Sequence, residues 1–123
     1  MSHCKQTEAE LRRERAAIIA RQNDQFRRQP YTGKAVMTVG VSALLGEDPQ
    51  QMVRLLNQIA EYSDFTPDND PHSEHDLGRF EFRGQQLLWK IDYYDNNWEF
   101  HSPDPMDPLV TQRVLTVMLT EEY

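Results

Sequence analysis

The chain has 123 residues, of which 38% are hydrophobic and 10% aromatic, enough for one core of two packed layers. No apolar run approaches the length of a membrane span, and the N-terminal residues lack the apolar segment of a secretory signal. A cytoplasmic protein is therefore expected. The single cysteine, Cys4, cannot form an internal disulfide and is interpreted as an incidental thiol.

The net charge of −7 is unevenly distributed along the chain. Residues 1–62 contain seven acidic and nine basic side chains, whereas residues 63–123 contain thirteen acidic and four basic ones, which gives the second half a net charge of −9. A field of this sign repels phosphate backbones and attracts a basic protein surface. The alternative is that these acids only keep the protein soluble.

The first predicted element is a basic helix. Thr7 and Glu10 form a capping-box pattern, and the helix should continue to about Arg28. Its apolar stripe is narrow and consists of Leu11, Ile18, Ile19 and Phe26. Because so narrow a stripe buries little surface, we divide the chain into a loosely docked helix at residues 1–29 and a single α+β domain at residues 30–123.

A strand and a second helix are predicted next. Ala35–Val41 is apolar and rich in β-branched residues, which indicates a strand buried on both faces. Asp48 before Pro49 is a typical start of a helix. The packing face of this helix repeats at three- and four-residue steps and comprises Met52, Leu55, Leu56, Ile59 and Ala60.

Three strands in a meander are predicted from "GRFEFRG", "QQLLWKIDYYD" and "WEFHS", with turns at Gly84 and at Asn96–Asn97. Side chains alternate between the two faces of a strand. In the middle strand the core face should carry Leu87, Trp89, Ile91 and Tyr93. The opposite face should carry Leu88, Lys90, Asp92 and Tyr94, which either bind a ligand or pair across a solvated sheet.

The C-terminal segment is predicted to be a largely buried helix. Asp107 followed by Pro108 repeats the capping pattern seen at Asp48 and Pro49. The helical stripe consists of Val110, Val114, Val117 and Met118, widened by Leu115 and Leu119. Two helices would then pack on one face of a four-stranded, mostly antiparallel sheet, which makes the predicted fold class a two-layer α+β domain with an additional N-terminal basic helix.

Four segments, "FTPDNDPHSEHDLGRFEF", "WKIDYYD", "SPDPMDPLVTQRVLTVML" and the terminal "EEY", resemble an uncharacterised bacterial family of unknown function whose members are often carried on plasmids and other mobile elements. The resemblance covers roughly residues 30–123. The matching positions are Asn69, Asp70, Pro71, Glu74, His75, Asp76, Gly78, Trp89, Lys90, Asp92, Tyr93, Tyr94, Asp95, Ser102, Asp104, Pro105, Asp107 and Pro108. The resemblance implies a mobile-element context and no particular reaction.

The loop "DFTPDNDPHSEHDLGRF", Asp64–Phe80, combines carboxylates, histidines and prolines ahead of the predicted sheet. Asp and Asn before proline form local turns, and His75 could hydrogen-bond Asp92, Asp95 or Asp104. We therefore predict a structural polar staple made of Asn69, His75, Asp76 and Asp104. A calcium loop is excluded because the required glycine and terminal glutamate are missing.

The function expected from these features is non-enzymatic. The chain has no nucleophile motif and no glycine-rich phosphate loop, and we predict no catalytic residue, cofactor or metal. An acidic surface is expected to bind a basic site on a host protein, for example as an anti-defence inhibitor of a CRISPR effector. The predicted partner-binding residues are Asp68, Asp70, Glu74, Lys90, Asp92, Tyr94 and Asp95.

Two alternatives remain open at the level of sequence. One is a metal-dependent or acid–base enzyme centred on His75 with Asp70, Asp76 and Asp104. The other is a nucleic-acid-binding regulator that uses the arginine-rich helix of residues 7–28, the only part of the chain in which direct nucleic-acid contact is expected. That helix could equally present a solvated face of Glu–Arg pairs.

Overall fold

The computed structural model describes residues 6–123 and shows three helices and a four-stranded sheet. The helices are α1 (Glu8–Arg28), α2 (Val39–Leu45) and α3 (Pro49–Ala60). The strands are β1 (Lys34–Met37), β2 (Leu77–Phe82), β3 (Gln85–Tyr94) and β4 (Gln112–Leu119). Cys4 lies outside the described residues. Within them, no helix is long and apolar enough to cross a membrane.

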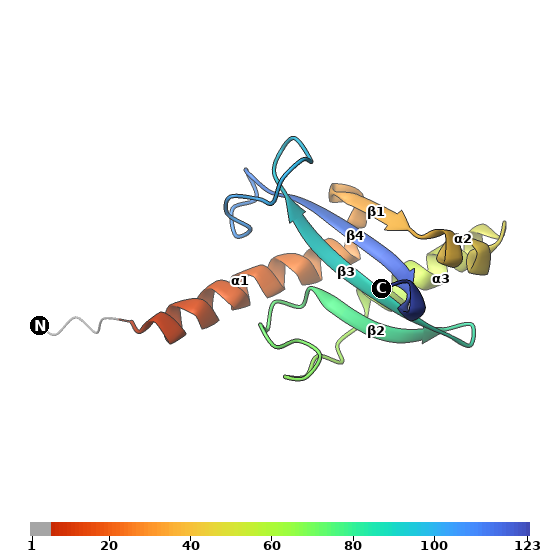
Figure 1. The fold of residues 1–123 in the computed structure, drawn as a ribbon, viewed down its shortest axis with the longest axis horizontal. Helices are drawn as coiled ribbons and strands as arrows, with labels where there is room; N and C mark the ends of the chain where they lie inside the picture. The colour runs from red at the N-terminus through yellow and green to blue at the C-terminus, as the bar shows by residue number, and fades with distance from the viewer. Residues whose placement is uncertain (1–5) are drawn as a thin grey trace, which may run out of the picture.

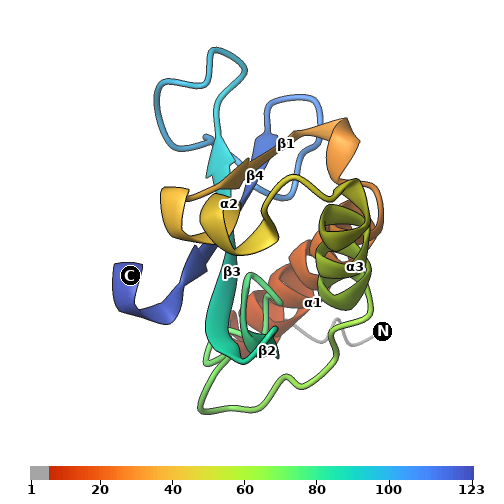
Figure 2. The same ribbon diagram turned by 90° about the vertical axis from the view of Figure 1, so that its right-hand side faces the viewer.

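The sheet is mixed, with strand order β1-β4-β3-β2. Strand β1 runs parallel to β4, and the other two pairings are antiparallel. Figure 1 shows α1 running behind the sheet and extending beyond it at its N-terminal end. Figure 2 shows α1 and α3 side by side on one side of the sheet. The predicted α+β class with a mostly antiparallel sheet is therefore confirmed.

Helix α1 has an exposed first half and a buried second half. The N–H of Glu10 donates to the Thr7 hydroxyl at 3.1 Å, so the predicted N-cap is confirmed. In the predicted stripe, Leu11 is exposed and Ile18 is half-buried, whereas Ile19 and Phe26 are buried. The buried face of the helix is completed by Ala20, Asn23 and Arg27.

The strand predicted over residues 35–41 is shorter and more exposed than expected. Strand β1 ends at Met37 and lies at the edge of the sheet, so the prediction of burial on both faces is wrong. Thr38 then caps α2, since its hydroxyl accepts from the N–H of Val41 at 3.4 Å. Packing of Val41 and Leu45 in the core outweighs the preference of the β-branched residues Val39 and Val41 for a strand.

Helix α3 agrees with its prediction. The carboxylate of Asp48 accepts from the N–H of Gln50 at 3.0 Å, and Pro49 occupies the first helical position. Leu55 and Ile59 are buried against the sheet. The local sequence is sufficient to predict this helix, because the N-cap residue, the proline and the spacing of the apolar residues all indicate the same element.

The β2–β3 hairpin is also close to its prediction. Its two-residue turn, Arg83–Gly84, has φ values of 50° and 78°, as a type I′ turn requires, and glycine adopts such angles without strain. Gly78 lies beneath the indole of Trp89, where an added Cβ would be 2.5 Å from Trp89 Nε1. The predicted core face of β3 is confirmed, and Leu88, expected on the solvated face, is buried as well.

The predicted C-terminal helix is wrong, because this segment forms β4, a central strand between β1 and β3. Val117 pairs with both Trp89 and Met37. A central strand is apolar on both faces, and its dense apolar run matches a helical stripe equally well. The pair Asp107–Pro108 forms a turn instead of a helix cap, with the N–H of Leu109 donating to the Asp107 carboxylate at 2.9 Å.

The predicted third meander strand, "WEFHS", is also wrong. Residues 95–111, which we name the β3–β4 loop, form an irregular connection in which a single bridge joins Tyr94 to His101. A turn does lie at Asn96–Asn97, where the N–H of Trp98 donates to the carbonyl of Asp95 at 3.0 Å, but the positive φ falls on Trp98, so this is not the expected two-residue hairpin turn. Instead the Asp95 carboxylate accepts the N–H groups of Asn97 and Glu99, each at 3.1 Å, and shapes a wider turn.

Candidate functional site: a stapled acidic loop and an exposed acidic connection

The loop between α3 and β2 is organised around a buried carboxylate. Asp70 is 5% exposed, and its oxygens accept the N–H groups of Glu74 at 3.2 Å and His75 at 3.3 Å. These bonds stabilise a backbone in which Ser73 and His75 have φ values of 57° and 56°. Asp70 was predicted to contact a partner, whereas its side chain is buried and its oxygens accept N–H groups within the loop.

Asn69 closes the preceding turn of the same loop. Its amide donates to the carbonyl of Asp64 at 2.9 Å and accepts the N–H of Thr66 at 2.9 Å. Asp68 is exposed next to it. The structure therefore places Asn69 in a local turn and leaves Asp68 available at the surface.

His75 fastens the loop to α1. Its Nδ1 lies 2.9 Å from the Asp24 carboxylate, and its ring stacks on Phe65 with centroids 3.9 Å apart. Its Nε2 lies 3.9 Å from Asp70. The predicted partners of His75, namely Asp92, Asp95 and Asp104, are replaced by Asp24, a helix residue far away in the sequence.

Arg27 lies behind this staple as a buried cation. Its guanidinium donates to the carbonyls of Ile59 at 2.7 Å and Tyr62 at 2.9 Å, and to Asp24 at 2.6 Å. It also lies 4.9 Å from the Trp89 ring centroid. Burial lowers the pKa of Arg27, and the Asp24 carboxylate opposes that shift. Arg27 thus donates to two carbonyls at and just beyond the C-terminal end of α3, where the helix runs out of its own N–H donors.

A second polar network surrounds Tyr93. Asn23 Nδ2 donates to the Tyr93 hydroxyl at 2.8 Å and to the carbonyl of Glu74 at 2.9 Å, while Arg113 Nε donates to Asn23 Oδ1 at 2.8 Å. The Tyr93 hydroxyl donates to the Glu74 carboxylate at 3.2 Å. Burial strongly raises the pKa of Tyr93, so the phenol stays protonated. Glu74, predicted to face a partner, is half-buried and belongs to this network.

The enzyme alternative required four residues to meet, and the structure does not bring them together. Asp70 lies beside His75, but the Asp104 carboxylate pairs with Arg15 at 3.1 Å and accepts the N–H of Met106 at 3.2 Å. Across residues 6–123 we find no group of three His, Cys, Asp or Glu side chains that could hold a metal ion. This geometry offers neither a metal centre nor a completed acid–base set.

Asp76 provides a test of the local electrostatics. Burial, reinforced by the neighbouring Glu74 carboxylate, raises the pKa of Asp76 above its ordinary value. A carboxyl whose pKa is raised by folding binds its proton more tightly in the folded state, so stability falls as the pH rises through that pKa. Asp76→Asn should therefore raise the melting temperature at pH 7, and the gain should shrink toward pH 4.

Thermal unfolding of the variant at both pH values measures this effect, with Asp68→Asn at an exposed position as the matched control. A lower melting temperature at pH 7, or the same gain at both pH values, would contradict the assignment of Asp76 as a destabilising buried charge.

The face of the sheet opposite α1 and α3 carries Lys90, Asp92 and Tyr94 of the predicted set. Lys90 Nζ lies 2.8 Å from the Asp92 carboxylate on β3, and this hydrogen bond raises the pKa of Lys90. Tyr94 is half-buried on the same face. Lys90 and Asp92 neutralise each other, so their pairing leaves little net charge for a partner.

The β3–β4 loop adjoins this face and is both acidic and apolar at its surface. Its acids are Asp95, Glu99, Asp104 and Asp107, and it contains no Lys or Arg. Phe100 is 70% exposed and Leu109 is 82% exposed. Trp98 has a φ of 62°, unusual for a bulky residue, and its ring lies 3.9 Å from Lys34 Nζ. The loop thus presents two large apolar side chains and the exposed acid Glu99, whereas Asp104 is paired with Arg15 and the Asp95 and Asp107 carboxylates accept backbone N–H groups.

Sequence reasoning missed three helix residues and three loop residues of these sites. The helix residues are Asn23, Asp24 and Arg27. Asn23 and Arg27 follow Ile19 at steps of four residues and therefore lie on the same face of the helix. Including polar residues in the predicted buried face would have identified them. The loop residues are Trp98, Phe100 and Leu109. The sequence alone predicts a strand for the first two and a helix for the third, so it does not identify them as loop residues.

Comparison with known proteins gives one match. Residues 37–122, more than half of the chain, match the model of a family described as "Protein of unknown function (DUF3768)". No curated protein and no solved structure matches the chain. The matched range begins after α1, although α1 supplies Asn23, Phe26 and Arg27 to the interior. The chain therefore belongs to the DUF3768 family of proteins of unknown function.

Proposed function

We propose that this protein is a non-enzymatic interaction module whose acidic surface binds a basic site on a host protein. The observation that carries the proposal is the β3–β4 loop, which contains four acidic and no basic residues and exposes Phe100, Leu109 and Glu99, while Arg15 of α1 pairs with only one of its acids, Asp104. Exposed aromatic and aliphatic side chains rimmed by charge are typical of protein interfaces. The acids select a basic partner, and the apolar side chains supply the buried contact.

The polar networks beneath the α3–β2 loop support a binding role over a catalytic one. Asp70, His75 and Glu74 are held by hydrogen bonds within the fold, which rigidifies the loop instead of leaving reactive groups free. A rigid scaffold with an exposed connection is a common arrangement for recognition.

In its most specific form, the proposal is an anti-defence inhibitor encoded on a mobile element. Such a protein would place its carboxylates in a groove of a defence protein, for instance a CRISPR effector, that normally holds nucleic acid. The net charge of −9 in residues 63–123 suits the imitation of a polyanion.

The test uses the full chain as bait against a purified basic target, a CRISPR effector complex of a bacterial host. We expect binding that weakens about tenfold or more between roughly 50 and 300 mM salt, and inhibition of target-DNA cleavage. The variant Phe100→Ala/Leu109→Ala/Glu99→Lys should lose both. The matched control, Val39→Ala/Val53→Ala/Glu81→Lys, changes exposed residues elsewhere and should keep both.

Two outcomes contradict the proposal. Binding that is insensitive to salt would show that charge does not drive the contact. Equal losses in the loop variant and in the control variant would show that the β3–β4 loop is not the interface.

A further inference from the structure

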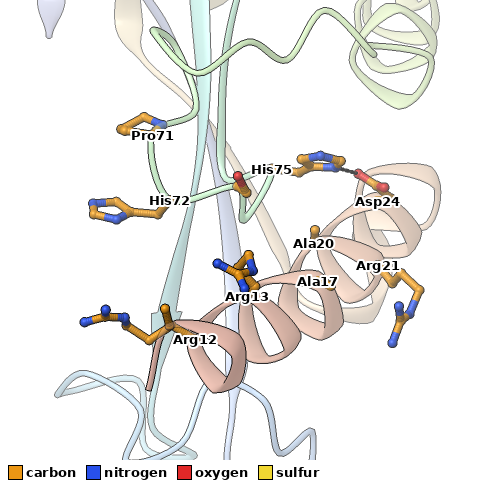
Figure 3. A pocket seen from close by; sticks show the side chains of 12 residues that line it. Arg12, Arg13, Ala17, Ala20, Arg21, Asp24, Pro71, His72 and His75 are labelled. Carbon is orange, nitrogen blue, oxygen red and sulfur yellow. Dashed lines mark hydrogen bonds and ion pairs between the residues drawn. The ribbon is translucent and has the colours of Figure 1, made fainter. Parts of the chain in front are cut away.

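A groove of about 700 Å³ runs along the first half of α1, between the helix and the turn Pro71–His75. Figure 3 shows the two walls facing each other, with the turn above and the helix below. The floor is made of methyl groups from one side of the helix, namely Ala9, Ala16, Ala17 and Ala20. The floor is therefore shallow and apolar over about three helical turns, or roughly 17 Å.

The rim of the groove is cationic. Its positive charges are those of Arg12, Arg13 and Arg21, and His72 lines the opposite wall. In Figure 3, Arg13 rises from the helix toward the turn, and Arg12 lies on the same side of the groove as His72. Among the described residues none of these arginines forms an ion pair, whereas Arg15 and Arg27 each do. A local positive surface is thus kept on a protein whose net charge is −7.

The far end of the groove is closed by side chains that already have partners. Asp24 accepts from both His75 and Arg27, so its carboxylate does not neutralise the arginines of the rim. The groove therefore has a cationic N-terminal part, an apolar floor and a rigid end, which together define a direction for a bound chain.

Two occupants fit this chemistry poorly. Symmetric pairing of two copies of the chain through the groove would bring the arginines of one rim against those of the other. A nucleic-acid backbone would gain the arginines but would also place phosphodiesters over a floor of methyl groups that donates no hydrogen bond. A partner needs carboxylates for the rim and small apolar side chains for the floor.

We propose that this groove binds an acidic amphipathic helix of a partner protein. Alanines let two helix axes approach to about 8 Å, so the apolar stripe of such a helix can pack on the floor. Its flanking carboxylates then reach Arg12, Arg13 and Arg21, whose planar guanidinium groups bind carboxylates in paired hydrogen bonds. The protein would thus carry two interaction surfaces of opposite charge, this groove and the β3–β4 loop.

The test measures binding of a fluorescent helical peptide of about 20 residues, with Ala and Leu on one face and Glu on both flanks, to the full chain. We expect Arg13→Glu to weaken binding about tenfold or more, and Ala17→Phe, which fills the floor, to weaken it similarly. The matched control is Arg28→Glu, an exposed arginine of the same helix outside the groove, which should change binding less than about twofold. Circular dichroism confirms that each variant is folded.

Three results would overturn the proposal. The first is equal binding of a peptide with Gln in place of Glu. The second is an equal effect of Arg28→Glu and Arg13→Glu. The third is tighter, Arg13-dependent binding of a single- or double-stranded oligonucleotide, which would assign the groove to nucleic acid. The variant Phe100→Ala/Leu109→Ala should leave peptide binding unchanged, so that this test and the test of the β3–β4 loop fail independently.

Discussion

Residues 30–123 expressed without α1 are expected not to fold cooperatively. The second half of α1 places Ile19 and Phe26 in the core and Asn23 and Arg27 in the two buried polar networks. Loss of a buried Phe alone costs about 3–5 kcal/mol, and small domains have only about 5–15 kcal/mol of stability in total. The truncated chain should lack a sigmoidal urea transition and give poorly dispersed NMR spectra.

The matched control is removal of residues 1–14, which are exposed or only partly buried where the structure describes them. This shorter truncation removes the Thr7 cap and should cost about 1 kcal/mol while preserving the fold. If residues 30–123 unfold in one transition with a stability near that of the full chain, α1 is a loosely docked appendage, as its narrow apolar stripe suggests. The shorter truncation removes Ala9, Arg12 and Arg13 of the groove while the fold remains, so it also separates a folding defect from a loss of binding in the groove.

Arg27→Ala should destabilise the protein by about 3–5 kcal/mol, the range for removing one partner of a buried ion pair. The change removes the guanidinium that donates to the carbonyls of Ile59 and Tyr62 and leaves Asp24 without its buried ion-pair partner. Arg27→Lys should recover only part of the loss, because an ammonium cannot reproduce the fork of donors or lie flat beside Trp89. Urea titration measures the loss of unfolding free energy in each variant, provided that the dependence of that free energy on urea concentration is the same as in the unsubstituted protein.

Arg28→Ala is the internal reference for this experiment. Arg28 is the next residue of the same helix and is exposed, so its removal should change the free energy of unfolding by less than about 0.5 kcal/mol. Equal effects at the two positions would contradict the role of Arg27 as a buried link between α1, α3 and β3. The pair of variants differs in burial while helix propensity and charge change are the same.

The α3–β2 loop shows why the candidate site was only partly predictable. The sequence indicates a turn at Asn69, because Asx-turns depend on neighbouring residues, and Asn69 closes such a turn with Thr66 and Asp64. The sequence could not indicate that Asp24 is the partner of His75, since these residues are 51 positions apart and meet only when α1 lies against the loop. Burial of Asp70 was equally hidden, because a loop carboxylate becomes buried only through the path of the surrounding backbone.

Some elements of the fold are likewise predictable from the local sequence, whereas others depend on contacts between distant segments. The starts of α1 and α3 and the β2–β3 hairpin were determined by the sequence alone, through Thr7, Asp48 and the Arg83–Gly84 turn. These signals act within four residues, so they need no tertiary context.

The tertiary structure alone decided the conformation of residues 112–119 and the surface of the β3–β4 loop. The segment Gln112–Leu119 is apolar enough for a buried helix or a buried strand, and pairing with β1 on one side and β3 on the other selects the strand. That strand order sends the chain through an exposed connection that carries Phe100 and Leu109. Hydrogen bonds between distant segments made this choice, and a single sequence contains no local signal for them.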